Sequence, residues 1–140
     1  MQQRDLIKDQ IEQLGKALAE ITNDFLKLKT SNRVPEAIQI TDERFQKYLN
    51  ISVEQLISVD KSQLPDYLNK NGLTAEHAER LSDYFREVGE SLIEQDSRRA
   101  KRRLRSAIDL LDAADELTQT ASFERMAKQA IISRILKQYE

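Results

Sequence analysis

Residues 5–29 read DLIKDQIEQLGKALAEITNDFLKLK, and the apolar positions of this segment decide the predicted fold. These positions form an apolar stripe that consists of Ile7, Ile11, Leu14, Leu18, Ile21, Phe25 and Leu28. The intervals between them alternate between four and three residues. This spacing keeps the side chains on one side of an α-helix, because the helix turns once every 3.6 residues. The segment is therefore predicted to be a long amphipathic helix.

The same stripe also fits the seam of a coiled coil over about three heptads. The positions beside the seam lack the Glu and Lys pairs that set partner choice between two such helices. Gly15 lies inside the segment, where glycine costs about 1 kcal/mol relative to alanine unless close packing needs its small size. We favour docking of this helix onto its own domain, and self-association through the seven stripe residues stays open as the alternative.

Similar apolar intervals continue along the chain and predict further helices. Thr74 is expected to cap the longest of them, and Gly72 to end the helix before it. The predicted helices cover residues 35–49, two short segments within 50–72, 75–94, 98–114 and 123–139. In the last of these, the residues expected on the inner face are Phe123, Ala127, Ala130, Ile131, Ile135 and Leu136.

These segments predict a single all-α domain over residues 1–140, with six to seven helices. Its parts are a long N-terminal helix at 1–30, short helices over 33–72, and three antiparallel helices over 73–140. A length of 140 residues suits one domain with a real core. The chain has only three glycines and two prolines, which argues against an all-β fold with its many turns.

The composition excludes several kinds of chemistry. The chain has no cysteine, so disulfides, thiol nucleophiles and thiolate metal sites are excluded. His77 is the only histidine, and position 74, three residues before it, is Thr and not the Glu of a di-iron motif. We expect His77 to be an exposed residue in the first turn of its helix. The sequence therefore predicts no enzyme activity, no cofactor and no metal.

A basic octet at residues 98–105 is the strongest local charge feature. Its six basic residues are Arg98, Arg99, Lys101, Arg102, Arg103 and Arg105. We favour a solvated helix face that acids on neighbouring helices balance. Binding of nucleic acid or another polyanion is the alternative, since cations that neutralise phosphates dominate nonspecific affinity. Three aspartates follow on the same helix and would repel a phosphate backbone: Asp109, Asp112 and Asp115.

The overall charge and hydropathy give no sign of a membrane protein. The formal net charge is −2, which creates no general bias toward nucleic acid or an anionic membrane. No apolar run approaches the ~20 residues of a membrane span, and the polar start of the chain is unlike a signal peptide. We expect a cytoplasmic protein.

Several apolar steps carry a resemblance across most of the chain. They are Arg4-Asp5-Leu6-Ile7 with Ile11, Leu14 and Gly15, then Leu49-Asn50-Ile51, Leu56-Ile57, Leu64, Leu68, Ala107 and Leu110-Leu111. In these positions the chain resembles a family of small, uncharacterised, all-helical bacterial proteins. The resemblance implies helical hairpins similar to tetratricopeptide units behind a long N-terminal helix, and it implies no activity, ligand or catalytic residue.

Together these observations favour a helical protein-interaction module. Helices stacked as hairpins leave grooves that hold a helix or an extended segment of a partner. The sequence does not identify that partner. Polyanion binding through the basic octet and a homo-oligomer built on the stripe of residues 5–29 remain the alternatives.

Overall fold

The structure is a computed structural model that describes the backbone of residues 2–140 and the side chains of residues 7–140. This part of the chain is all-helical and contains no strand, which confirms the predicted fold class. Its elements are α1 (Gln2–Ser31), α2 (Val34–Leu49), α3 (Val53–Ser58), the short 3₁₀ helix η1 (Lys61–Gln63), α4 (Leu64–Lys70), α5 (Ala75–Leu92), α6 (Ser97–Thr118) and α7 (Phe123–Gln138). The described part leaves out Met1 and the side chains of residues 2–6. Three residues of the family resemblance therefore lie outside the described side chains: Arg4, Asp5 and Leu6.

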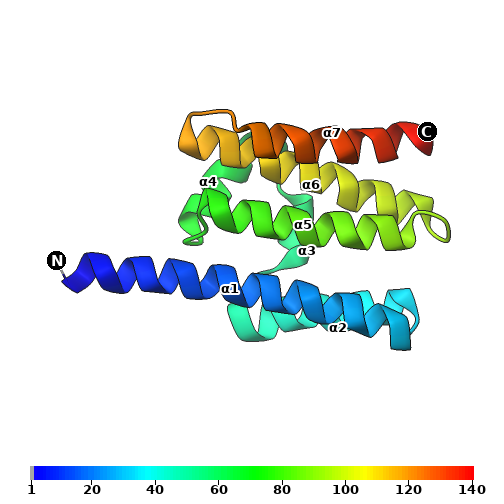
Figure 1. Ribbon diagram of the computed structural model, residues 1–140, viewed down its shortest axis with the longest axis horizontal. Helices are drawn as coiled ribbons and strands as arrows, with labels where there is room; N and C mark the ends of the chain where they lie inside the picture. Colours follow the sequence, from blue (N-terminus) through cyan, green and yellow to red (C-terminus); the bar gives the residue numbers. More distant parts are fainter. Residues whose placement is uncertain (1) are drawn as a thin grey trace.

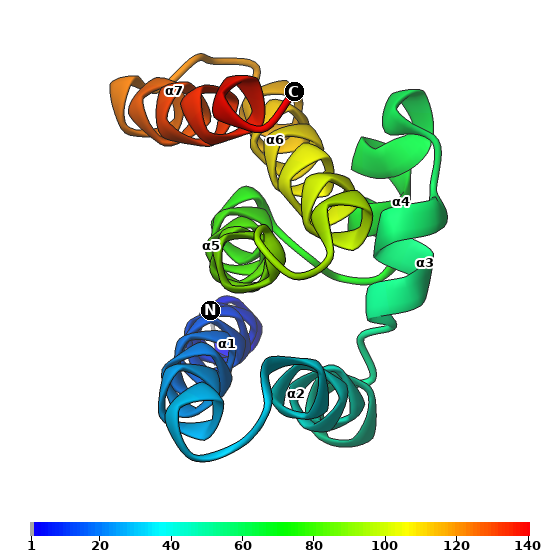
Figure 2. The ribbon, with the colours of Figure 1, turned by 90° about the vertical axis from the view of Figure 1, so that its right-hand side faces the viewer.

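The long helices form layers around α5. Figure 1 shows α5, α6 and α7 running in alternating directions, with α1 along the other side of α5. In the end-on view of Figure 2, α5 lies between α1 and α6, and the short helices α3 and α4 flank α6. Contacts with α1, α2, α6 and α7 make α5 the centre of the molecule. No helix in the described part of the chain has the length and apolar character that crossing a membrane requires.

Polar caps fix where the helices begin, and the cap that the sequence predicted at Thr74 is among them. The hydroxyls of Ser52, Thr74 and Ser122 accept hydrogen bonds from backbone N–H groups in the first turns of α3, α5 and α7. Asp96 caps α6 in the same way. Gly72 adopts a φ of 71°, the left-handed conformation that costs glycine little, immediately after α4.

Aromatic side chains from three helices form the centre of the core. Tyr84 of α5 packs against Phe25 of α1, Phe45 of α2 and its neighbour Phe85, with ring centroids 5.5, 4.8 and 6.0 Å apart. The arrangement with Phe25 is edge-to-face, which aromatic quadrupoles favour. These contacts dock α1 and α2 onto α5.

The predicted inner face of the last helix was partly wrong. Ile135 and Leu136 pack against the core, but Phe123, Ala127, Ala130 and Ile131 are exposed. Ion pairs set the rotation of α7, because the nearly buried guanidinium of Arg125 bonds Asp115 of α6 (2.6 Å) and Glu79 of α5 (3.2 Å). Lys128 adds an ion pair with Asp83 (3.1 Å) on the same side of the helix. The apolar spacing of α7 could not reveal this, since its apolar residues lie on two sides.

Two helical glycines differ in what surrounds them. A Cβ atom on Gly89 of α5 would lie 2.5 Å from the side chain of Leu104 and 3.2 Å from the carbonyl oxygen of Ala100, both in α6. The bare backbone at Gly89 is therefore what allows α5 and α6 to pack so closely. A Cβ on Gly15 of α1 would meet no atom closer than 3.6 Å, which is an ordinary contact. Close packing does not require glycine at position 15.

We predict opposite effects when these two glycines are changed to alanine. Gly15→Ala should raise the free energy of unfolding by about 0.5–1 kcal/mol, because alanine restricts the unfolded chain and favours a helix. Gly89→Ala should lower it by about 1–3 kcal/mol, because the added methyl overpacks the interface between α5 and α6. Urea unfolding followed by circular dichroism at 222 nm measures both values. A stabilising Gly89→Ala would contradict this account of the interface.

Candidate functional site

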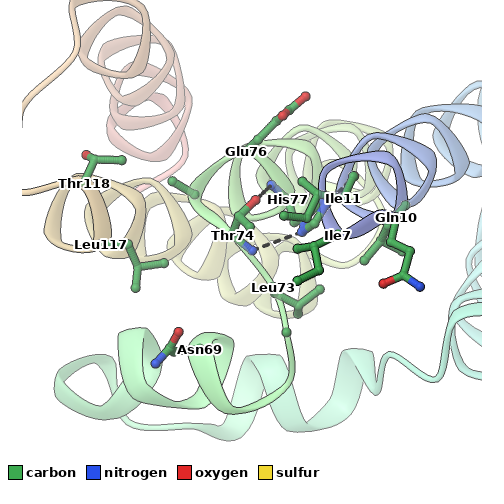
Figure 3. Close-up of a pocket in the computed structure, with 13 residues that line it drawn as sticks. Ile7, Gln10, Ile11, Asn69, Leu73, Thr74, Glu76, His77, Leu117 and Thr118 are labelled. Carbon is green, nitrogen blue, oxygen red and sulfur yellow. Dashed lines mark hydrogen bonds between the residues drawn. The ribbon is translucent and has the colours of Figure 1, made fainter. Parts of the chain in front are cut away.

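A groove of about 860 Å³ opens at the end of the molecule where α1 begins. Figure 3 shows it between the N-terminal part of α1, the connection from α4 to α5, and the C-terminal end of α6. Large apolar side chains dominate its walls, and they are Ile7, Ile11, Leu14, Leu73 and Leu117. Ile7 is 56% exposed. The groove is thus an apolar surface that water covers in the isolated chain.

His77 joins two walls of this groove, and the expectation that it is exposed was wrong. Its side chain is fully buried. Its Nδ1 accepts a hydrogen bond from the Thr74 N–H (3.0 Å), while the Thr74 hydroxyl accepts one from the His77 N–H (3.4 Å). This reciprocal arrangement is a capping box in which histidine takes the place of the usual Glu or Gln.

The other ring nitrogen of His77 reaches across to α1. Its Nε2 lies 2.8 Å from the carbonyl oxygen of Ile11. Because Nδ1 accepts a hydrogen bond, Nε2 carries the proton and donates it to this carbonyl. Both nitrogens therefore hold the walls of the groove together, and neither is free to act as a base. The spacing of Thr74 and His77 hints at the cap, but nothing in the local sequence signals a contact 66 residues away.

The groove offers little reactive chemistry beyond this histidine. Its other polar side chains are Gln10, Asn69, Thr74, Glu76 and Thr118. Within the described residues, no group of three or more His, Asp and Glu side chains could hold a metal ion. An apolar surface with a few polar groups that fix orientation is typical of sites that bind ligands.

The apolar stripe of α1 serves two different surfaces. Leu18, Ile21 and Phe25 are buried where α1 packs against α2 and α5. Ile11, Leu14 and Leu28 are half-buried, and the first two line the groove together with Ile7. The central part of the stripe is therefore occupied by the chain's own core, and its N-terminal part is what remains open to a partner.

Arg103 of the basic octet is engaged inside the protein. Its guanidinium is nearly buried and binds both carboxylate oxygens of Asp42, with Nη1–Oδ1 at 3.3 Å and Nη2–Oδ2 at 2.5 Å. The Tyr84 hydroxyl donates to the same carboxylate (2.7 Å), and the guanidinium lies 5.3 Å from the centroid of Phe85. Arg103 therefore connects α6 to α2 and α5 and is not available to an external anion.

The other five basic residues of the octet face solvent to different degrees. Lys101 is half-buried, and the exposed residues are Arg98, Arg99, Arg102 and Arg105. Among the residues that the structure describes, no acid forms an ion pair with any of the five. The acids that follow on α6 are already paired, Asp109 and Asp112 with Lys61, and Asp115 with Arg125. The octet thus contains one internal arginine and five cations without an acidic partner.

Comparison with known proteins adds no relative. No protein-family model matches the sequence, and neither a curated protein nor a solved structure matches it. The resemblance to a family of bacterial helical proteins stays a prediction. The candidate surfaces are therefore defined by geometry alone.

Burial and the contacts with Asp42 shift the pKa values of Tyr84 and Arg103. Burial raises the pKa of the Tyr84 hydroxyl far above its ordinary value, and the adjacent charge of Asp42 raises it further. Burial lowers the pKa of Arg103, but the hydrogen bond and the charge of Asp42 outweigh this effect, so its net shift is upward. Tyr84 therefore remains protonated, and Arg103 charged, as long as the protein is folded.

We predict that Tyr84 ionises only when the protein unfolds in alkali. The unfolded chain releases this proton near pH 10, whereas the folded state retains it. The stability that the group contributes is complete below pH 10 and falls as the pH rises beyond it. A titration followed by tyrosinate absorbance should show at least one of the four tyrosines ionising together with the loss of helical circular dichroism. Tyr84→Phe should remove this late phase, and complete titration of the folded wild-type protein would contradict the prediction.

Proposed function

We propose that the protein is a non-catalytic interaction module whose groove binds an amphipathic helical segment of a partner protein. The observation that carries the proposal is an open apolar groove whose only imidazole is committed to holding the walls together. A helix that lies in such a groove inserts apolar residues spaced three and four apart. The hairpin arrangement that the sequence resembles supports the same role, since stacked helical hairpins leave grooves between them.

The shape of the groove favours a peptide over a buried small molecule. The N-terminal part of α1 extends past the start of α5 (Figure 1), and Ile7 on this part is 56% exposed, so one wall of the groove continues as an exposed helix surface. A partner helix that packs along this wall would cover Ile7 and place further apolar side chains between Leu73 and Leu117. Each large apolar side chain that becomes buried contributes about 1.5–3 kcal/mol of favourable transfer free energy.

We also propose that the protein is cytoplasmic and bacterial. The lack of cysteine supports the first part of this proposal, and the family resemblance supports the second.

Selection of helical peptides from a displayed library tests the groove directly. We predict that peptides selected on the wild-type protein carry apolar residues at i, i+3 or i+4, and i+7. Ile7→Glu should weaken their binding at least about tenfold, because it places a charge on the apolar wall. The side chain is more than half exposed, so this change should leave the fold intact. Fluorescence anisotropy of labelled peptides measures the affinities.

Ile40→Glu is the matched control, because Ile40 is an exposed isoleucine of α2 that does not line the groove. It should leave peptide binding unchanged. Equal loss of binding in both variants, or selected peptides that ignore Ile7→Glu, would refute the groove as the binding site.

A polyanion site on α6 is the second candidate, and the observation in its favour is the set of five octet cations that pair with no acid among the described side chains, residues 7–140. Such cations release counterions from a phosphate backbone when they bind. Ion pairs with Lys61 and Arg125 offset part of the negative charge of the aspartates farther along α6, which weakens the objection that these aspartates repel a phosphate backbone. The site would consist of Arg98, Arg99, Lys101, Arg102 and Arg105, without Arg103.

The salt dependence of binding to a 20-nucleotide DNA duplex tests this candidate. If the octet binds DNA, replacing Arg98, Arg102 and Arg105 by Ala should reduce the slope of log affinity against log salt by about 2.7. These three residues are exposed and make no ion pair in the described part of the chain, so the protein should remain folded. Electrophoretic mobility shifts at several salt concentrations give the slopes. Duplex binding with an unchanged slope, or no binding at low salt, would eliminate the candidate.

A further inference from the structure

The outer face of α7, defined by Phe123, Met126, Ala127, Ala130 and Ile131, is apolar and open to solvent. Phe123 is 90% exposed and Met126 is 52% exposed. Ala127, Ala130 and Ile131 are also exposed. Large apolar side chains gathered on one exposed helix face mark an interaction surface. No residue of α7 lines the groove between α1 and α6, so this surface is independent of the proposed function.

The order of residues along α7 makes this face self-complementary. Phe123, Ala127, Ala130 and Arg134 follow one another at intervals of four, three and four residues, so they form one line along the helix. The sequence of side chains on this line is large, small, small, large. When a second copy lies antiparallel, the small residues meet at the crossing point and each Phe123 lies opposite Arg134 of the other copy.

We propose that the outer face of α7 binds the same face of a second copy of the chain, with the two helices antiparallel. Such a contact has twofold symmetry, in which one patch is used by both subunits. The alanines at the centre allow the two helix backbones to approach. The ring of Phe123 is covered by the guanidinium of Arg134 from the other copy, a favourable cation–π arrangement.

Charge complementarity supports a second copy as the occupant. Glu124 lies in the first turn of α7, and Arg134 and Lys137 lie near its end. All three are exposed, and none forms an ion pair with the residues that the structure describes. In an antiparallel pair the acidic end of each helix lies beside the basic end of the other. A parallel pair would instead place like charges together.

The size of the surface predicts a weak dimer. A helix of 16 residues is about 24 Å long, so one face of it is smaller than the ~800 Å² per partner of a standard interface. We therefore expect a monomer–dimer equilibrium that depends on concentration and weakens as salt rises. The contacts of Arg125 and Lys128 with Glu79 and Asp83 keep α7 in the orientation that the dimer needs.

Sedimentation equilibrium of the full chain, from 10 µM to about 1 mM, tests the proposal. We expect dimer formation in this range, and Phe123→Glu should weaken it at least about tenfold. Tyr48→Glu is the control, because Tyr48 is an exposed aromatic residue of α2 outside this face. Glu124→Arg should weaken the dimer as well, and the double variant Glu124→Arg with Arg134→Glu should restore it.

Disulfide formation tests the antiparallel arrangement, since the chain has no cysteine of its own. When equal amounts of Ala127→Cys and Ala130→Cys proteins are mixed and oxidised, the 127–130 product should make up clearly more than half of all cross-linked dimer, the share that random pairing alone gives. Three results would each overturn the proposal: a monomer at 1 mM, a dimer that Phe123→Glu leaves unchanged, or cross-links between like positions in excess. A dimer that resists Phe123→Glu would point to another surface, such as the stripe of α1.

Discussion

The rest of the structure depends on the contacts that the ring and the hydroxyl of Tyr84 make at the centre of the core. The ring packs between Phe25 of α1 and Phe45 of α2, and the hydroxyl donates to Asp42. The Nη1 and Nη2 atoms of Arg103 of α6 bind the same carboxylate. One side chain of α5 thereby contacts α1 and α2 and, through Asp42, is connected to α6, which are three of the four long helices that pack against α5. A buried ion pair of this kind is costly to break, because removing one partner leaves an uncompensated charge in the core. The geometry of the contacts around Tyr84 therefore fixes how α1, α2 and α6 are placed around α5. The same contacts stabilise the packing of these helices.

The same principle explains the orientation of α7. Apolar burial alone does not determine its rotation, since Ile132 is the only apolar side chain of the helix that is fully buried among the described residues. Arg125 bonds Asp115 and Glu79, and it also donates to the Thr118 hydroxyl and the Thr120 carbonyl oxygen of the preceding loop. These directional polar contacts hold α7 by the side that carries Arg125. The consequence is that Phe123 and Met126, which the core could have used, face solvent.

The sequence predicts the parts of the fold that depend on local rules. The helix spacing of residues 5–29, the cap at Thr74 and the left-handed stop at Gly72 each need only a few neighbouring residues, and the structure contains all of them. The contacts that shape the candidate sites span far larger separations, 61 residues for Arg103 with Asp42 and 66 for His77 with Ile11. A single sequence carries no signal for such pairs. Local charge and periodicity therefore assigned Arg103 to a solvated cluster, His77 to the surface and Phe123 to the core.

The positions of the candidate surfaces follow from where polar contacts hold the helices. His77 fixes α1 to α5 at Ile11, and the part of α1 before this point extends past the bundle with Ile7 uncovered. Arg125 and Lys128 fix α7 by one side, and its apolar side remains open. In both places a polar contact determines the geometry, and apolar residues that the fold does not need are left at the surface. Because exposed apolar area of this kind adds nothing to the stability of the isolated chain, association is the role that best accounts for it. The two proposed surfaces have different chemistry, a concave groove suited to a foreign helix and a self-complementary helix face suited to a second copy. Because they share no residue, the two proposed associations do not compete with each other.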